Sequence, residues 1–144
     1  GTPDQSVPAM IDYFKKYDIS ALGIGTFGPA DINPNSPTYG SIMRSPKKDW
    51  EGFSLYKAFT DALGCLVVVD TDVNAAAWGE YLYGALKGLN SGMYLTVGTG
   101  IGGGIISDGR LIHGMEHPET GHILIPKAKT SQPTHRYGIL KHFI

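Results

Sequence analysis

The sequence predicts an α/β fold, and three observations lead to this prediction. Helix-like and strand-like segments alternate along the first half of the 144-residue chain. The run CLVVVD at 65–70 is short, apolar and β-branched, as expected of a buried strand. A glycine-rich turn then lies between two strand-like runs, and Asp108-Gly109 favours a type I′ hairpin. The predicted order is an α/β unit followed by a β-meander.

The individual elements follow from local patterns. The first helix is expected over 7–17, because apolar residues recur there at helical spacing and Pro8 suits a first turn. The stretch 29–50 holds several prolines and asparagines and is expected to be irregular loop. The other expected elements are a strand at 21–28, helices at 53–63 and 73–86, a strand at 93–100 and a hairpin at 102–114.

Composition excludes some classes of partner. The net charge is -1, from 12 basic and 13 acidic residues, which argues against a nucleic-acid-binding or anionic-membrane surface. No apolar run is long enough to cross a bilayer. Cys65 is the single cysteine, so no intrachain disulfide forms, and a reducing cytoplasm is the expected location.

Five of the seven residues in Gly98–Gly104 are glycine. The string matches GxGxxG, but a hairpin rather than a helix follows, so a dinucleotide-binding motif is rejected. Two interpretations stay open. The exposed N–H groups of the turn and the Thr99 hydroxyl could hold a phosphate, or the glycines could allow a tight turn with close strand packing.

Asp70 and Asp72 end the buried strand, and Asp72 stands where the next helix begins. Asp72 could be the N-cap of that helix, or a general base at the carboxyl end of a strand, where α/β sheets place ligands. Asn74 could make a first-turn hydrogen bond or contact a sugar hydroxyl.

The segment HGMEHPETGH contains five acidic and imidazole side chains, which are His113, Glu116, His117, Glu119 and His122. These side chains could form a metal site, could recognise a polyol, or could be solvated residues of a loop.

Taken together, these segments resemble the ROK family of sugar kinases, and its fructokinase branch in particular. The resemblance covers about residues 1–126 and rests on GIGTFGP at 23–29, DTDVNAAAWGEYLYGA at 70–85, GTGIGGGIISDGRLIHG at 98–114 and HPETGH at 117–122. The fructose-type character rests on the 25–40 loop and on Thr71, where glucokinase-like members tend to have Asn.

The resemblance implies part of an actin-like, RNase H-like ATPase fold, from the end of the small lobe to the start of the large one. It implies lobes at 1–88 and 89–126 and an atypical tail at 127–144. The implied reaction is ATP-dependent phosphorylation of a hexose, namely fructose to fructose 6-phosphate, with magnesium accompanying ATP. A homodimer is also implied.

Site roles come from the same resemblance. Asp72 would be the base that accepts the proton of the sugar hydroxyl. The ATP phosphates would be held by Gly98, Thr99, Gly100 and Gly102. The sugar would be bound by Gly28, Pro29, Asn74, Glu119 and His122.

This chain also departs from the family pattern. His122 is a zinc ligand in many members, but the cysteines of that zinc motif are absent here. The first phosphate loop and the adenine-binding half are also absent, so the chain resembles an internal portion of a kinase. A non-catalytic sugar-binding module and an inactive truncated fragment are therefore the alternative functions.

Overall fold

The computed structural model describes residues 1–98, 100–114, 120–126 and 137–139. These residues form two compact units. The first is essentially Gly1–Ala75, and the second comprises Ala76–His113 and the described residues from Thr120 onward. The units divide inside the helix at 72–83, ahead of the boundary between residues 88 and 89 that the resemblance implies for the lobes. The lobe assignment itself stays a prediction, and most of the 127–144 tail lies outside the described residues.

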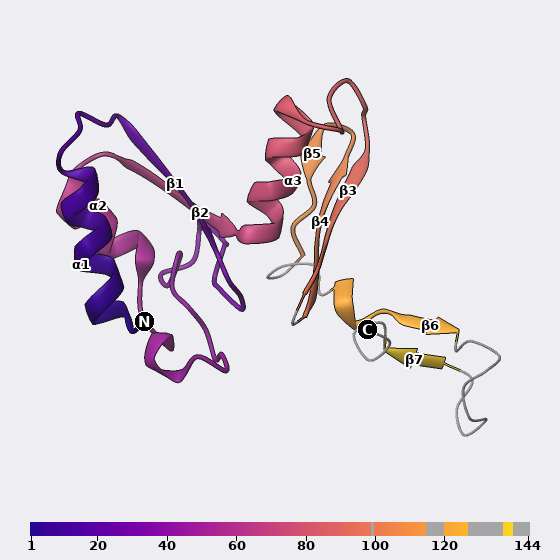
Figure 1. The fold of residues 1–144 in the computed structure, drawn as a ribbon, viewed down its shortest axis with the longest axis horizontal. Helices are drawn as coiled ribbons and strands as arrows, with labels where there is room; N and C mark the ends of the chain where they lie inside the picture. Colours follow the sequence, from indigo (N-terminus) through magenta and orange to yellow (C-terminus); the bar gives the residue numbers. More distant parts are fainter. Residues whose placement is uncertain (99, 115–119, 127–136, 140–144) are drawn as a thin grey trace. The chain divides into compact units, whose positions relative to one another are not determined.

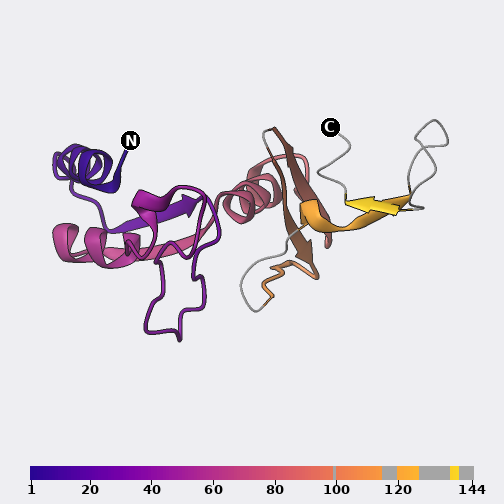
Figure 2. The same cartoon turned by 90° about the horizontal axis from the view of Figure 1, so that it is seen from below.

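The first unit is a β-α-β arrangement preceded by a helix (Figure 1 and Figure 2). Strand β1 (Ala21–Thr26) pairs in parallel with β2 (Leu66–Thr71), in a register that runs from Ala21 opposite Leu66 to Thr26 opposite Thr71. The other elements in chain order are α1 (Pro3–Phe14), the 3-10 turn η1 (Lys48–Trp50), α2 (Leu55–Leu63) and α3 (Asp72–Tyr83). Because β2 runs directly into α3, the carboxyl end of the strand is also the start of a helix.

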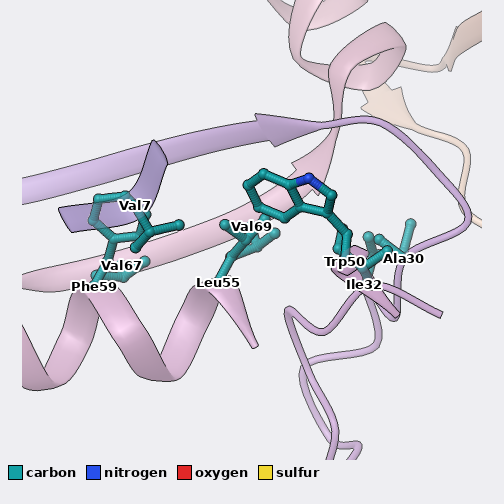
Figure 3. Close-up of a cluster of buried hydrophobic side chains, with 9 residues drawn as sticks. Val7, Ala30, Ile32, Trp50, Leu55, Phe59, Val67 and Val69 are labelled. Atoms are coloured by element: carbon teal, nitrogen blue, oxygen red, sulfur yellow. The ribbon is translucent and has the colours of Figure 1, made fainter. Parts of the chain in front are cut away.

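The core of this unit lies on one face of the two-stranded sheet. Val67 and Val69 of β2 are buried there, together with Leu55 and Phe59 of α2 and Val7 of α1 (Figure 3). The alternating residues of β2 point to the opposite face, where Leu66 is 66% exposed and Val68 is 52% exposed. The strand predicted from CLVVVD is therefore confirmed, but it is buried on one face only and not on both.

The first helix differs from its prediction. It begins at Pro3, so Pro8 lies inside the helix rather than in its first turn. Pro3 suits the first helical position, since the missing N–H of proline has no partner to lose there. The residues of that first turn are mostly polar, and apolar spacing therefore detected the helix only from Val7 onward.

The second unit is built around an antiparallel hairpin. Strands β3 (Gly92–Val97), β4 (Ile101–Ser107) and β5 (Arg110–Leu111) form one sheet. Asp108 has φ 50° and Gly109 has φ 72°, the two positive values that a type I′ turn needs, which confirms the predicted hairpin. The 3-10 turn η2 (Thr120–His122) is followed by β6 (Leu124–Pro126), which pairs with β7 (Tyr137–Ile139). Among the described helices, none combines the length and the apolar character that crossing a bilayer demands.

Candidate functional site

Two of the predicted site segments lie at the same edge of the β1–β2 sheet. The strands are parallel, and Thr26 is the register partner of Thr71. Asp72 therefore follows β2 at the edge where Gly28 and Pro29 follow β1. The peptide bond between Gly28 and Pro29 is cis, and both residues are half-buried. This carboxyl edge is the position at which open α/β sheets bind ligands.

Thr71, rather than Asp72, caps helix α3. The Thr71 hydroxyl accepts a hydrogen bond from the main-chain N–H of Asn74 at 3.2 Å, as an N-cap residue does three positions before its partner. Asp72 is the first helical residue, its side chain is exposed, and its Oδ1 accepts from the N–H of Val73 at 2.9 Å. The N-cap interpretation of Asp72 is thus wrong for this helix, and its carboxylate faces solvent.

Asp70 ties the end of β2 to the first turn of α3. Its Oδ1 accepts hydrogen bonds from the N–H of Thr71 and from the side-chain amide of Asn74, each at 2.7 Å. Asn74 is fully buried, and its Oδ1 has no hydrogen-bond partner among the described residues. Of the two roles considered for Asn74, the first-turn hydrogen bond is the one that the geometry supplies. Sequence reasoning missed the role of Asp70, although its spacing of four residues from Asn74 was a signal.

Gly25 of β1 packs against the main chain at the start of α3. A β-carbon built on Gly25 would lie 3.0 Å from the β-carbon of Ala75 and 3.4 Å from the α-carbon of Asp72. The first distance is shorter than normal carbon–carbon contact, so a larger residue would displace the helix start. Sequence reasoning did not single out Gly25, although it lies within the GIGTFGP segment.

The turn between β3 and β4 leaves open space at its glycines. Gly98 and Gly100 are exposed, and apart from their chain neighbours no atom of the described residues lies within 4 Å of a β-carbon built on either. Gly98 does not have a positive φ. The N–H of Gly98 donates to the carbonyl of Gly100 at 2.9 Å. Packing among the described residues therefore gives no reason for glycine at these two positions, whereas the approach of a ligand would. Thr99 lies outside the described residues.

The later glycines of the run are not part of the turn. Gly102 lies within β4, opposite Thr96, and not in the turn. The predicted contact between Gly102 and a phosphate therefore has no support from the turn geometry. Gly103 faces η2, because a β-carbon there would lie 2.8 Å from the Thr120 hydroxyl oxygen. The two proposed reasons for the glycine run thus apply to different residues: close packing explains Gly103, and open space marks Gly98 and Gly100.

The acidic and imidazole cluster is described only in part. Glu116, His117 and Glu119 lie outside the described residues. His122 lies in η2 with an exposed side chain. Within the part of the chain that the structure describes, no group of three or more His, Cys, Asp or Glu side chains could hold a metal ion. A zinc site at His122 therefore has no support from the neighbouring described side chains.

A large cavity lies elsewhere in the first unit. It has a volume of about 1070 Å³ and runs along β1, between α1 and the 46–50 segment. Apolar side chains such as Phe14, Leu22 and Trp50 line it. None of the predicted site residues is among its lining residues, so it is not the candidate site.

An exposed acid at a parallel strand end and an open glycine turn are features of an α/β protein that handles phosphate. The chain belongs to the ROK family, whose family model matches residues 4–135. It is 46% identical over 123 residues to a putative fructokinase of Bacillus subtilis and 42% identical over 127 residues to a fructokinase of Zymomonas mobilis. These matches cover 85% and 84% of this chain but 41% and 42% of the relatives.

A solved relative agrees with this assignment. The ROK family glucokinase of Streptomyces griseus, in complex with glucose and AMPPNP, matches with a TM-score of 0.70 and 35% identity. The match covers 85% of this chain and 39% of the glucokinase. The chain thus has part of the actin-like ATPase fold of ROK sugar kinases and spans about two fifths of the length of these relatives.

Proposed function

We propose that this chain carries the general base and one phosphate-binding turn of an ATP-dependent hexose kinase. The sugar hydroxyl oxygen attacks the γ-phosphorus of ATP, its proton passes to the Asp72 carboxylate, and ADP leaves. The observation that carries the proposal is the exposed Asp72 carboxylate at the carboxyl end of β2, where Thr71 rather than Asp72 is the N-cap of α3. The family relationship supports the same assignment.

The proposed sugar is fructose, phosphorylated to fructose 6-phosphate. Support comes from the two relatives above, which are named fructokinase and match over most of this chain. The glucokinase solved with glucose belongs to the same family, so glucose is the competing substrate. Gly28 and Pro29, at the same sheet edge as Asp72, are proposed to line the sugar pocket, with Glu119 and His122 as further sugar ligands.

The proposed nucleotide contacts are the exposed main-chain groups of Gly98 and Gly100, together with Thr99. Magnesium would neutralise charge on the phosphates and would arrive bound to ATP.

The test is ATP-dependent phosphorylation of fructose, glucose and mannose by the whole chain and by its Asp72→Asn variant. We expect turnover that falls by roughly 10²–10⁴-fold in the variant, because the amide cannot accept the proton. Asp61→Asn is the matched control, since it alters an exposed carboxylate that pairs with Lys57 in α2. Sugar binding without turnover would replace the proposal with a binding module, and neither binding nor turnover would support an inactive fragment.

A further inference from the structure

We infer that Asp70 and Asn74 form a positioning pair that fixes the orientation of Asp72. The inference rests on the proposed function of Asp72 as the base and assigns a role to residues that need not touch the sugar. Its starting point is the sequence order: Asp70 and Thr71 precede Asp72, Asn74 follows it by two residues, and hydrogen bonds join the residues on either side.

Asn74 makes both of the connections across Asp72. Its side-chain amide donates to Asp70 Oδ1 at 2.7 Å, and its main-chain N–H donates to the Thr71 hydroxyl at 3.2 Å. The segment containing Asp72 is therefore closed into a short loop at both the side-chain and the main-chain level. A hydrogen bond to a charged carboxylate is stronger than one between neutral groups, so the Asp70–Asn74 bond is the stronger constraint.

Burial separates the supporting residues from the base. Asn74 is 0% exposed and Thr71 is 2% exposed, whereas the Asp72 side chain is exposed. A side chain enclosed to this degree has little freedom to meet a sugar, but it can hold the backbone around it in one conformation. The arrangement is one rigid, buried support beneath one solvent-facing acid, which is what a positioned general base requires.

The buried Oδ1 of Asn74 strengthens this assignment. Within the described part of the chain that atom has no hydrogen-bond partner, and leaving a buried acceptor unpaired is costly. An apolar residue of similar size would avoid the cost, so the amide at this position is explained by what its NH₂ group does. The described contact of that group is the bond to Asp70.

The experiment compares Asn74→Asp with the exchanged pair, Asp70→Asn combined with Asn74→Asp, in the whole chain. The single variant places two carboxylates at hydrogen-bonding distance, and their repulsion opens the support. We expect kcat to fall by roughly tenfold or more, with the KM for sugar within about twofold of the parent value. The exchanged pair restores a carboxylate–amide bond and should recover most of kcat.

Other outcomes overturn the inference. A rise in sugar KM that the exchanged pair does not reverse would make Asn74 a sugar ligand, and an unchanged kcat in Asn74→Asp would remove its role altogether. Asn90→Asp, an exposed change of the same chemistry, is the matched control. Hydrogen exchange of the α3 amides gives a readout besides activity: it should quicken in Asn74→Asp and return in the exchanged pair.

Failure of the proposed function would look different. If the parent chain shows no turnover with any of the three sugars, the base role of Asp72 is lost and the catalytic role of the pair falls with it. The hydrogen-exchange result would still report whether the pair holds the first turn of α3. If the parent chain phosphorylates a sugar but Asn74→Asp and the exchanged pair do not give the expected changes in kcat, only the positioning inference is overturned.

Discussion

Gly25 of β1 lies directly against the main chain of Asp72, with 3.4 Å between the position of a β-carbon on Gly25 and the α-carbon of Asp72. The contact joins the end of one parallel strand to the residue that follows the other. The proposed base is thus located by packing from β1 as well as by hydrogen bonds from β2.

The Gly25→Ala variant tests this packing. The added methyl group would meet Ala75 at 3.0 Å, so we expect the start of α3 to shift and kcat to fall by roughly tenfold or more. Gly23→Ala is the control, because a β-carbon there meets no atom within 4 Å. Steady-state kinetics of both variants provide the measurement, and equal effects of the two would contradict the prediction.

Thr71→Val tests the cap of α3. The substitution keeps the buried volume and removes the oxygen that accepts from Asn74, so the free energy of unfolding should drop by about 1 kcal/mol. Urea denaturation measures the change. Thr71→Ser retains the oxygen and should lose less stability. A larger loss of unfolding free energy in Thr71→Ser than in Thr71→Val would show that Thr71 stabilises the protein by packing and not by capping α3.

The Gly103→Ala variant tests the close approach of η2 to β4. The new methyl group would lie 2.8 Å from Thr120 Oγ1, and overpacking of this kind should cost about 1–3 kcal/mol of unfolding free energy. Thr120→Ala in the same chain should relieve the clash at little cost of its own, since the Thr120 hydroxyl is buried without a hydrogen-bond partner. Additive losses in the double variant would argue against the contact.

Gly98→Ala and Gly100→Ala separate folding from ligand approach. The space beside both glycines is open, so the melting temperature should stay within about one degree of the parent. If ATP phosphates pack against this turn, the added methyl groups should raise the KM for ATP severalfold while the KM for sugar stays constant. An unchanged KM for ATP would remove the turn from the proposed nucleotide site.

The Asp31 carboxyl group in the 31–41 loop should make the stability of the protein depend on pH. Burial raises the pKa of this carboxyl, but hydrogen bonds from Ser36, Thr38 and the Asn33 N–H outweigh it and lower the pKa overall. The folded state therefore favours the carboxylate, and its stabilisation is present above the unfolded pKa and lost as the pH falls through the folded one. In an NMR titration, the midpoint of Asp31 should be higher in Thr38→Val than in the parent chain. An unchanged midpoint would show that the hydrogen bond from Thr38 does not lower the pKa of Asp31.

The sequence was a reliable guide where a pattern depends on near neighbours. The β-branched run of β2 and the Asp108-Gly109 turn both follow from short-range chemistry, and the structure confirms both. The start of α1 was misplaced because its first turn lacks the apolar spacing that indicates a helix. The cap of α3 was misassigned by one residue, since Asp70, Thr71 and Asp72 all carry side chains that cap helices well.

The features that sequence reasoning missed depend on residues distant in the chain. Gly25 is explained by Asp72 and Ala75, and Gly103 is explained by Thr120. A run of glycines cannot reveal which of them faces a turn and which faces a neighbouring segment, because the neighbour is set by the fold. Among the predicted site residues, Gly28, Pro29, Asp72 and Asn74 lie at the carboxyl edge of the β1–β2 sheet, whereas Gly98, Gly100, Gly102 and His122 belong to the second unit.

The contacts described around Asp72 come from Gly25 and from residues 70–75, all within one compact unit. The proposed proton acceptor is thus preorganised before any substrate arrives, because its surroundings belong to a single folded unit. Its geometry should therefore be the same in the free and in the sugar-bound protein.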